Sequence, residues 1–315
     1  MPETMTAAVA TSPGEIRLTE VDRPAPWLGE VLVQVRAAGI NPADCRAAAG
    51  RGLPVEHPFP LGWEMAGVVR AVGPMVTRFA PGDEVLGLLR FPRPGGCHAE
   101  FVTAPTRQLA LRPAALSPEA AAALPLAGLT AWQALTEVAR VEAGQRVLVT
   151  AAGGGVGHLA VRLARRLGAT VIATASEGKH ALVRGWGADE VIDHTRKDPA
   201  TEVADVDVVL DLLGGRETER LLGTPRPGGV LVRVAGGDPA PFAGADGRRG
   251  VPMLVEPDHA ALAELASLAA GGEVEVLVER TWPLAELPAA YAAVEAGHAV
   301  GKTVLTVDAC ELPAG

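Results

Sequence analysis

A glycine-rich segment between a strand-like run and an amphipathic run has residue types and spacing that suggest chemistry. Residues 147–157 read Val-Leu-Val-Thr-Ala-Ala-Gly-Gly-Gly-Val-Gly, so Ala151, Gly154 and Gly157 follow an Ala-x-x-Gly-x-x-Gly spacing. Glycines let the backbone approach a pyrophosphate, and the following helix directs free N–H groups at it. A tight turn without a ligand is the alternative, because the spacing is not Gly-x-Gly-x-x-Gly. We expect a dinucleotide phosphate loop made of Gly153, Gly154, Gly155, Val156 and Gly157.

Residues after the next strand-like run, 170–175, bear on which dinucleotide would bind. An acidic residue at the end of the second strand of such a sheet holds the ribose 2′-OH of NAD. Here the run ends on alanine, and Ser176 and Lys179 follow with a hydroxyl and a positive charge for a 2′-phosphate. Glu177 would suit a 2′-OH instead, and Lys179 also suits a solvated charge at a helix start. We expect NADPH in preference to NADH.

The strand and helix that hold this loop belong to an alternating pattern that begins near Ser117. Ser117 before Pro118 is typical of a helix N-terminus, with a capping hydroxyl and proline at the first helical position. Strands alternating with helices from there on predict right-handed βαβ units on a parallel sheet. The predicted strands are 146–150, 170–175, 190–192, 206–210 and 230–235, and the predicted helices are 156–167, 178–186, 217–222 and 260–270.

The first third of the chain has a different pattern, with short strand-like runs between glycine and proline turns. Val31, Val33 and Val35 alternate with longer or polar residues, as expected for a half-buried strand. Further strands are predicted at 65–72 and 84–89. This pattern indicates a compact domain resembling a β-barrel, and a strand-like run at 302–307 resumes it near the end of the chain.

Composition restricts the class of protein. The 315 residues are 48% apolar and 21% charged, which is ordinary for a globular chain of about two domains. Aromatic residues make up 3%, and the net charge is −9, so we expect no nucleic-acid partner. No run of 18 apolar residues occurs and the first residues lack an apolar signal core, so we expect no membrane association. Cys45, Cys97 and Cys310 form no paired motif, which favours a cytoplasmic location.

Residues 151–161 resemble the phosphate loop of the medium-chain dehydrogenase/reductase superfamily, in its zinc-free quinone oxidoreductase branch. Similar stretches recur in the family's order at 39–44, 61–67, 81–85, 128–131, 187–192 and 301–305. The resemblance implies an α/β chain with two domains. A GroES-like, β-rich catalytic domain would comprise 1–119 and 273–315, and a Rossmann domain with a doubly wound parallel sheet would comprise 120–272. The active site would lie in the cleft between them.

Zinc-dependent alcohol dehydrogenases of this superfamily carry a cysteine and a His-Glu pair where this sequence has Asn41 and Trp63-Glu64. Neither asparagine nor tryptophan is a plausible zinc ligand, so we expect no metal. We interpret Cys45 and Cys97 as buried or half-buried thiols and His98 as a polar loop residue. Tyr291 is the single tyrosine, and we interpret it as a packing residue.

The resemblance also implies roles for individual residues. Asn41 and Thr130 would lie near the nicotinamide and the substrate carbonyl, although Asn41 also suits an Asn-Pro turn and Thr130 a helix cap. Asp44 suits a proton relay or, better, a hydrogen bond within a turn. His194 occupies a family position near the adenosine phosphate. The remaining expected cofactor contacts follow two parallel strands and are Leu213, Gly214, Val234, Ala235 and Gly236.

Taken together, these residues predict an NADPH-dependent, zinc-independent oxidoreductase that transfers hydride to a quinone or an enone. The alternatives are a catalytically silent NADPH-binding sensor and a zinc alcohol dehydrogenase. The loops at 47–60 and 91–96 would line the substrate cleft but carry no specificity code. By resemblance we expect a homodimer that pairs through a sheet edge near 251–255.

Overall fold

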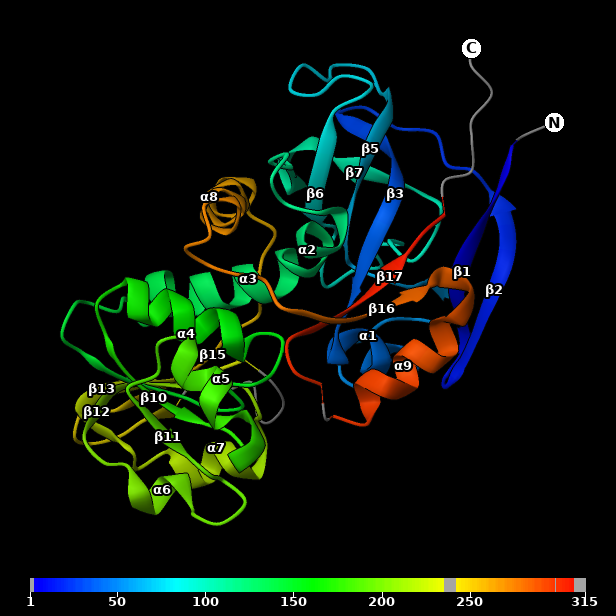
Figure 1. Ribbon diagram of the computed structural model, residues 1–315. Helices are drawn as coiled ribbons and strands as arrows, with labels where there is room; N and C mark the ends of the chain where they lie inside the picture. The colour runs from blue at the N-terminus through cyan, green and yellow to red at the C-terminus, as the bar shows by residue number, and fades with distance from the viewer. Residues whose placement is uncertain (1–2, 235–241, 298, 309–315) are drawn as a thin grey trace. The chain divides into compact units, whose positions relative to one another are not determined.

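The computed structural model describes residues 3–234, 242–297 and 299–308 and divides the chain into two compact units (Figure 1). Unit 1 comprises Met1–Leu129, Glu256–Gly272 and Val276–Gly315, and unit 2 comprises Thr130–Val255 and Glu273–Glu275. In the described ranges, no helix is both long and apolar enough to cross a membrane.

Unit 1 is built mainly from antiparallel strands in two sheets. The smaller sheet has the order β2-β1-β4, and the larger has the order β16-β17-β3-β5-β6-β8, with β7 also paired to β3. The strands are β1 (Thr4–Ser12), β2 (Glu15–Asp22), β3 (Glu30–Ile40), β4 (Phe59–Pro60), β5 (Glu64–Val72), β6 (Glu84–Leu88), β7 (Phe101–Pro105), β8 (Leu109–Leu111), β16 (Val278–Pro283) and β17 (Lys302–Thr306). The pairing of β17 with β3 returns the end of the chain to its first third, as the resumed strand pattern predicts.

Strand β3 differs from its prediction as a half-buried strand. Val31, Val33 and Val35 are fully buried as expected, but Leu32 and Gln34 between them are also almost completely covered. A strand inside a sheet is buried on both faces when other elements cover both. The Gln34 side chain accepts hydrogen bonds at 2.9 and 2.6 Å from Arg70, which satisfies the buried amide oxygen.

The helices of unit 1 connect and cover these strands. They are α1 (Pro42–Ala48), α2 (Pro118–Ala123), α8 (His259–Ala270) and α9 (Leu287–Glu295), with 3₁₀ turns η1 (Thr106–Gln108) and η4 (Leu284–Glu286). The predicted helix start at Ser117 is confirmed, since its side chain accepts a hydrogen bond of 3.2 Å from the N–H of Ala120. The helix α3 (Pro125–Trp132) follows directly.

Unit 2 contains a doubly wound sheet, which confirms the predicted fold class. Its strand order is β11-β10-β9-β12-β13-β15-β14, parallel throughout except for the short β14. The strands are β9 (Arg146–Val149), β10 (Thr170–Thr174), β11 (Glu190–Ile192), β12 (Val206–Asp211), β13 (Pro225–Arg233), β14 (Phe242–Ala243) and β15 (Arg249–Pro252). The helical elements are the π-helix η2 (Gln133–Val138), α4 (Gly157–Arg166), η3 (Glu177–Lys179), α5 (His180–Gly185), α6 (Pro199–Glu202) and α7 (Arg216–Leu221).

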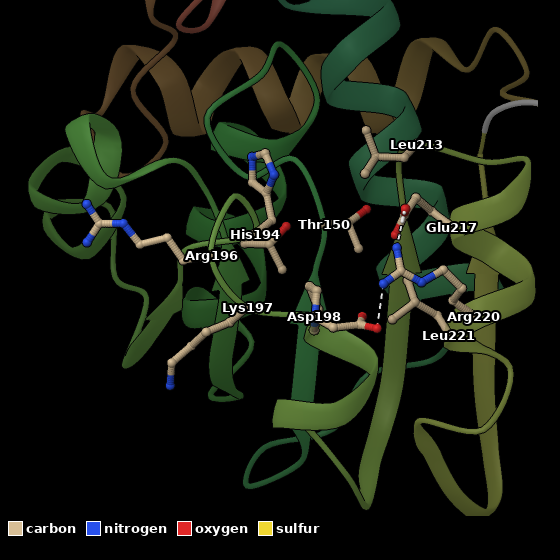
Figure 2. Close-up of a pocket in the computed structure, with 11 residues that line it drawn as sticks. Thr150, His194, Arg196, Lys197, Asp198, Leu213, Glu217, Arg220 and Leu221 are labelled. Atoms are coloured by element: carbon tan, nitrogen blue, oxygen red, sulfur yellow. Dashed lines mark hydrogen bonds and ion pairs between the residues drawn. The ribbon is translucent and has the colours of Figure 1, made fainter.

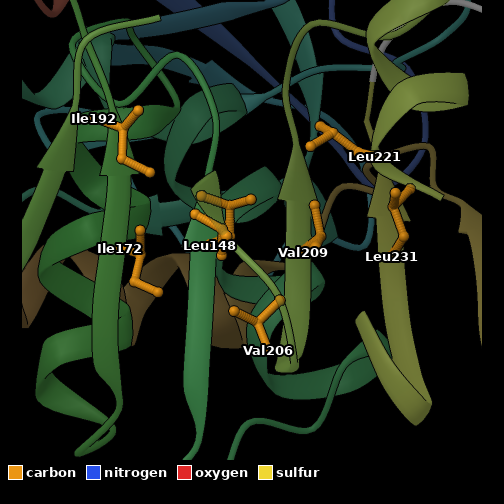
Figure 3. Packing of buried hydrophobic residues seen from close by; sticks show 8 residues of the cluster. Leu148, Ile172, Ile192, Val206, Val209, Leu221 and Leu231 are labelled. Atoms are coloured by element: carbon orange, nitrogen blue, oxygen red, sulfur yellow. The ribbon is translucent and has the colours of Figure 1, made fainter. Parts of the chain in front are cut away.

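One face of this sheet carries an apolar cluster that holds the strands in place. Leu148, Ile172 and Ile192 come from neighbouring strands, and Leu221 of α7 packs on the same cluster (Figure 3). All four side chains are at most 4% exposed. Because this core fixes the strands, it also fixes the residues that follow their C-terminal ends.

The limits of the two units differ from the predicted domain limits. Residues 256–272 were assigned by sequence to the Rossmann domain, but α8 belongs to unit 1, where Leu265 lies against Gly128. Residues 120–129 likewise belong to unit 1. A helical pattern does not reveal which unit its apolar face packs against, so alternation alone could not place this helix.

Candidate functional site

A pocket of about 310 Å³ lies at the C-terminal ends of the parallel strands of unit 2 (Figure 2). Thr150 follows β9, Thr174 ends β10, and His194 lies just after β11. Chain order reverses between β9 and β12, and ligands of open α/β sheets bind at such a point. The pocket is lined by Thr150, Thr174, His194, Arg196, Lys197, Asp198, Pro199, Leu213, Glu217, Arg220 and Leu221.

The glycine-rich turn connects β9 to α4 beside this edge. Ala151 has a φ of +47°, and its carbonyl accepts a hydrogen bond of 2.9 Å from the N–H of Gly154. A Cβ on Gly157 would lie 2.3 Å from the Ala151 carbonyl oxygen, so the close packing of the turn on the helix requires glycine there. Val156 precedes the helix without a side-chain cap, and the positive end of the helix dipole lies at this turn. The N–H groups of His158 and Ala160 already donate to the carbonyls of Gly154 and Val156, at 3.1 and 2.9 Å.

Lys179 lies over this turn. A Cβ on Gly153 would lie 2.7 Å from Cδ of Lys179 and 3.7 Å from its Nζ. A larger residue at position 153 would therefore displace the lysine side chain from this place. The structure thus brings together two expected cofactor contacts that are separated in sequence by a full strand and helix.

Asp211, at the end of β12, holds the residues that follow this strand at the C-terminal edge of the unit 2 sheet. Its Oδ1 accepts hydrogen bonds from the N–H groups of Leu213 at 3.0 Å and Gly214 at 3.2 Å. Its Oδ2 accepts a hydrogen bond from the Thr218 hydroxyl at the start of α7. Asp211 also stands beside Val234, whose N–H donates to the Asp211 carbonyl at 3.0 Å. Sequence reasoning named Leu213, Gly214 and Val234 but missed the buried carboxylate that places them.

Ion pairs cross the lower part of the pocket. Arg220 of α7 reaches both Glu217, at 2.9 Å, and Asp198 (Figure 2). The hydrogen bond from Arg220 is the main cause that lowers the pKa of Asp198. The guanidinium group therefore has carboxylate partners on two sides.

The expected cofactor residues thus gather at one edge of unit 2, with some exceptions. Ser176 begins the 3₁₀ turn η3 after β10, and the exposed His194 lines the pocket. Ala235 and Gly236 lie outside the described residues. Thr130 is 1% exposed and lies in α3.

Asn41 is part of a buried polar cluster in unit 1. Its side-chain Nδ2 donates to Glu64 Oε1 at 2.7 Å, and its Oδ1 accepts from the ammonium group of Lys302. The same ammonium group lies 2.6 Å from Glu64 Oε1. The second Glu64 oxygen accepts from the N–H of Leu126 at 2.7 Å. All three side chains are at most 4% exposed, so the amide plane of Asn41 is held in a fixed orientation.

This cluster does not suit a metal ion. The ammonium group of Lys302 is already the cation beside Glu64, and a second cation there would be repelled. Over the ranges that the structure describes, no three His, Cys, Asp or Glu side chains gather as a ligand set. Cys45 and Cys97 are buried, and burial raises the pKa of both thiols. The side chains present therefore do not fit the zinc site of the alcohol dehydrogenases.

Asp44 forms the turn bond that its position allows. One carboxylate oxygen accepts a hydrogen bond of 2.8 Å from the backbone N–H of Asn41 at the start of α1. Among the described residues, the other oxygen has no hydrogen-bond partner. Burial raises the pKa of Asp44 to about 7.

His98 and Tyr291 form a buried pair that the sequence does not reveal. Nε2 of His98 lies 3.1 Å from the Gly39 carbonyl, so that nitrogen carries the proton. Nδ1 must then accept a hydrogen bond from the Tyr291 hydroxyl at 3.1 Å. His98 lies in a bend between β6 and β7, as its interpretation as a polar loop residue predicts, but both side chains are at most 4% exposed. Burial lowers the pKa of His98 to about 4.

The two loops expected to line a substrate site meet within unit 1. They enclose a pocket of about 400 Å³ whose lining residues are Pro54, Val55, Glu56, Pro58, Phe59, Pro60, Pro92, Arg93 and Pro94. Proline has no N–H group, so this wall offers few backbone donors and suits an apolar group.

Residues 28–114 match the family described as alcohol dehydrogenase GroES-like domain, and residues 186–305 match the family described as zinc-binding dehydrogenase. The chain is 39% identical to a spectinabilin polyketide synthase system protein of Streptomyces orinoci over 91% of its own length. It spans only 14% of that relative. It is 32% identical to the mitochondrial NAD(P)H oxidoreductase RTN4IP1 of Mus musculus, over 88% of this chain and 82% of that protein.

Among solved structures, the quinone oxidoreductase from Coxiella burnetii is similar. It superimposes with a TM-score of 0.89 at 32% identity, over 97% of this chain and all of that one. The chain therefore belongs to the medium-chain dehydrogenase/reductase superfamily of oxidoreductases.

Proposed function

We propose that this protein is an NADPH-dependent reductase of quinones or α,β-unsaturated carbonyls that works without zinc. The observation that carries the proposal is the buried ammonium group of Lys302 beside Glu64 and Asn41. In the zinc-dependent alcohol dehydrogenases of the superfamily, the positions of Asn41 and of Trp63-Glu64 carry a cysteine and a His-Glu pair. Here Asn41 and Glu64 form a polar cluster with Lys302 that orients an amide group.

The residues for a nicotinamide dinucleotide lie at the C-terminal edge of unit 2. The turn at 153–157 would hold the pyrophosphate, because the helix after it has no side-chain cap and the turn has no Cβ at its closest packing point. Lys179, Ser176 and His194 would surround the adenosine ribose. When bound, NADPH would supply the hydride.

The class of hydride acceptor follows from how readily the reduced product can be protonated or stabilised without a metal. An alkoxide product resembles hydroxide, whose conjugate acid has a pKa of ~16, and a Lewis acid greatly helps to stabilise it. A hydroquinone product has a pKa of about 10, as for tyrosine, so a hydrogen-bond donor is enough. Glu64 accepts one of the two amide N–H groups of Asn41, and we assign the other to the acceptor oxygen. Thr130 would hold the nicotinamide carboxamide or ribose.

The relatives support the same chemistry. One is named a quinone oxidoreductase, another an NAD(P)H oxidoreductase, and a third belongs to a polyketide synthase system. The chain spans a small part of that last protein, so the whole synthase's chemistry is not transferred. A homodimer and a cytoplasmic location remain part of the proposal.

The test is NADPH oxidation by the purified protein in the presence of a chelator, with a panel of quinones and enones. We expect turnover with at least one acceptor class and no dependence on added zinc. Tight NADPH binding without turnover of any acceptor would favour a silent cofactor-binding protein. Turnover that the chelator abolishes and zinc restores would favour an alcohol dehydrogenase.

A further inference from the structure

An ion pair between Glu177 and Arg196 joins two loops at the edge of the unit 2 sheet. Glu177 follows β10, Arg196 follows β11, and the two strands are neighbours. Arg196 Nη2 lies 2.7 Å from Glu177 Oε2, and Arg196 Nε lies 3.6 Å from Asp193 Oδ2. The guanidinium group therefore lies between two carboxylates at the position where a Rossmann sheet meets the adenosine ribose.

This pair contributes little to the stability of the fold. The side chains of Glu177 and Arg196 are 66% and 68% exposed, and water screens the attraction between such exposed charges. Asp193 is better fixed, since its Oδ1 accepts hydrogen bonds from the Thr195 N–H at 2.9 Å and hydroxyl at 2.6 Å. Arg196 therefore has a well-positioned carboxylate 3.6 Å away on one side and can exchange its partner on the other.

Glu177 conflicts with the expected cofactor. A carboxylate at this point accepts a hydrogen bond from a ribose 2′-OH but repels a 2′-phosphate. The guanidinium group of Arg196 compensates the negative charge of Glu177 and points away from Arg220 and the ion pairs of the lower pocket (Figure 2). A guanidinium group also binds phosphate by paired, charge-assisted hydrogen bonds.

We propose that Arg196 is a specificity-determining residue for the 2′-phosphate, a proposal that rests on the NADPH-dependent function above. In the free protein, Arg196 pairs with Glu177. When a 2′-phosphate enters beside Lys179, Arg196 exchanges the carboxylate for the phosphate. Without Arg196, the uncompensated Glu177 selects the 2′-OH of NADH.

The test measures nucleotide binding rather than turnover. Adenosine 2′,5′-bisphosphate and 5′-AMP are titrated calorimetrically into the full chain and into Arg196→Gln, Glu177→Gln and the double variant. We expect Arg196→Gln to weaken the bisphosphate by about tenfold to a hundredfold, the value of a charge-assisted hydrogen bond, and to leave 5′-AMP unchanged. The double variant should recover part of this loss, because the repelling carboxylate is gone.

The matched control is Arg165→Gln. Arg165 is 58% exposed, pairs with Asp189 at 3.2 Å and is not among the residues that line the pocket, so its loss changes the net charge equally. Similar losses in both arginine variants, equal losses for both nucleotides, or no recovery in the double variant would overturn the proposal. Wild-type protein that binds neither nucleotide would overturn the cofactor assignment as well. Binding that follows these expectations without any turnover would uphold Arg196 and count against the proposed activity.

Discussion

At the scale of single residues, the buried charges of unit 1 carry the sharpest consequences. Lys302 and Glu64 lie 238 residues apart in sequence, and both are almost completely excluded from water. Each is tolerable there only because the other is present, since an unpaired buried charge costs several kcal/mol. Nothing in the local sequence around either residue signals this partnership.

Replacing Lys302 with methionine should therefore destabilise the protein strongly. Glu64 would keep the hydrogen bonds from Asn41 and Leu126 but lose its counter-charge. We expect a loss of about 3–5 kcal/mol in the free energy of unfolding, measured by urea denaturation. The double variant Lys302→Met with Glu64→Gln should recover part of it. A single variant as stable as wild type would show that the pair is not buried as described.

Asp44 and His98 give opposite dependences of stability on pH. Burial raises the pKa of Asp44 from 3.8 to about 7, so its contribution to stability is present below pH 4 and is lost as the pH rises to about 7. Burial lowers the pKa of His98 from 6.5 to about 4, so its contribution is present above pH 6.5 and is lost as the pH falls to about 4.

Replacing Asp44 with asparagine should remove one of these two opposite dependences of stability on pH. Between pH 4 and 7, the unfolding free energy of wild type should fall relative to the variant by about 1.4 kcal/mol per pH unit. Urea titrations across this range measure the difference, and His98→Gln should change the slope in the opposite direction. A difference between Asp44→Asn and wild type that does not vary with pH would contradict the assignment.

At the scale of elements, local sequence patterns predicted much of the secondary structure. They predicted few of the contacts between residues that lie far apart in sequence. The strand at 146–150, the helix after the glycine turn and the Ser117 cap were evident because each depends on neighbouring residues. The predicted helix at about 178–186 is confirmed as α5, which a 3₁₀ turn precedes. The partner of His98 was hidden because Tyr291 lies 193 residues away and reaches it only in the folded chain.

The glycine turn gives a prediction at this scale. Gly157→Ala should weaken NADPH binding by at least tenfold, because the new Cβ would lie 2.3 Å from the Ala151 carbonyl and displace the turn from the helix. Fluorescence titration of the reduced nicotinamide measures it. The matched control is Gly185→Ala in α5, where a Cβ meets nothing within 4 Å. That change should leave binding intact and stabilise the helix by about 0.5–1 kcal/mol. Equal binding by both variants would remove the turn from the cofactor site.

At the scale of the whole molecule, the chain leaves unit 1, builds unit 2 and returns to unit 1, apart from the short segment Glu273–Glu275, which belongs to unit 2. The resemblance to the superfamily predicted this order, whereas the limits at 119 and 272 were placed too early and too late to match the units. The reason is that residues 120–129 and α8 pack with unit 1. The sequence has no long linker-like stretch, so its composition does not show where one unit ends and the other begins.

The thermal stability of the folded protein distinguishes stabilisation by a bound cofactor from stabilisation by a bound metal. NADPH that binds only the folded protein should raise its unfolding free energy by about 2.7 kcal/mol at a concentration a hundredfold above the dissociation constant. Thermal unfolding measured with NADPH, with NADH and with a chelator tests this. We expect the largest rise in melting temperature with NADPH and no change with the chelator, because Lys302 already supplies the positive charge beside Glu64. A fall in melting temperature with the chelator that zinc reverses would mean that a metal, rather than the Lys302 ammonium group, holds this cluster together.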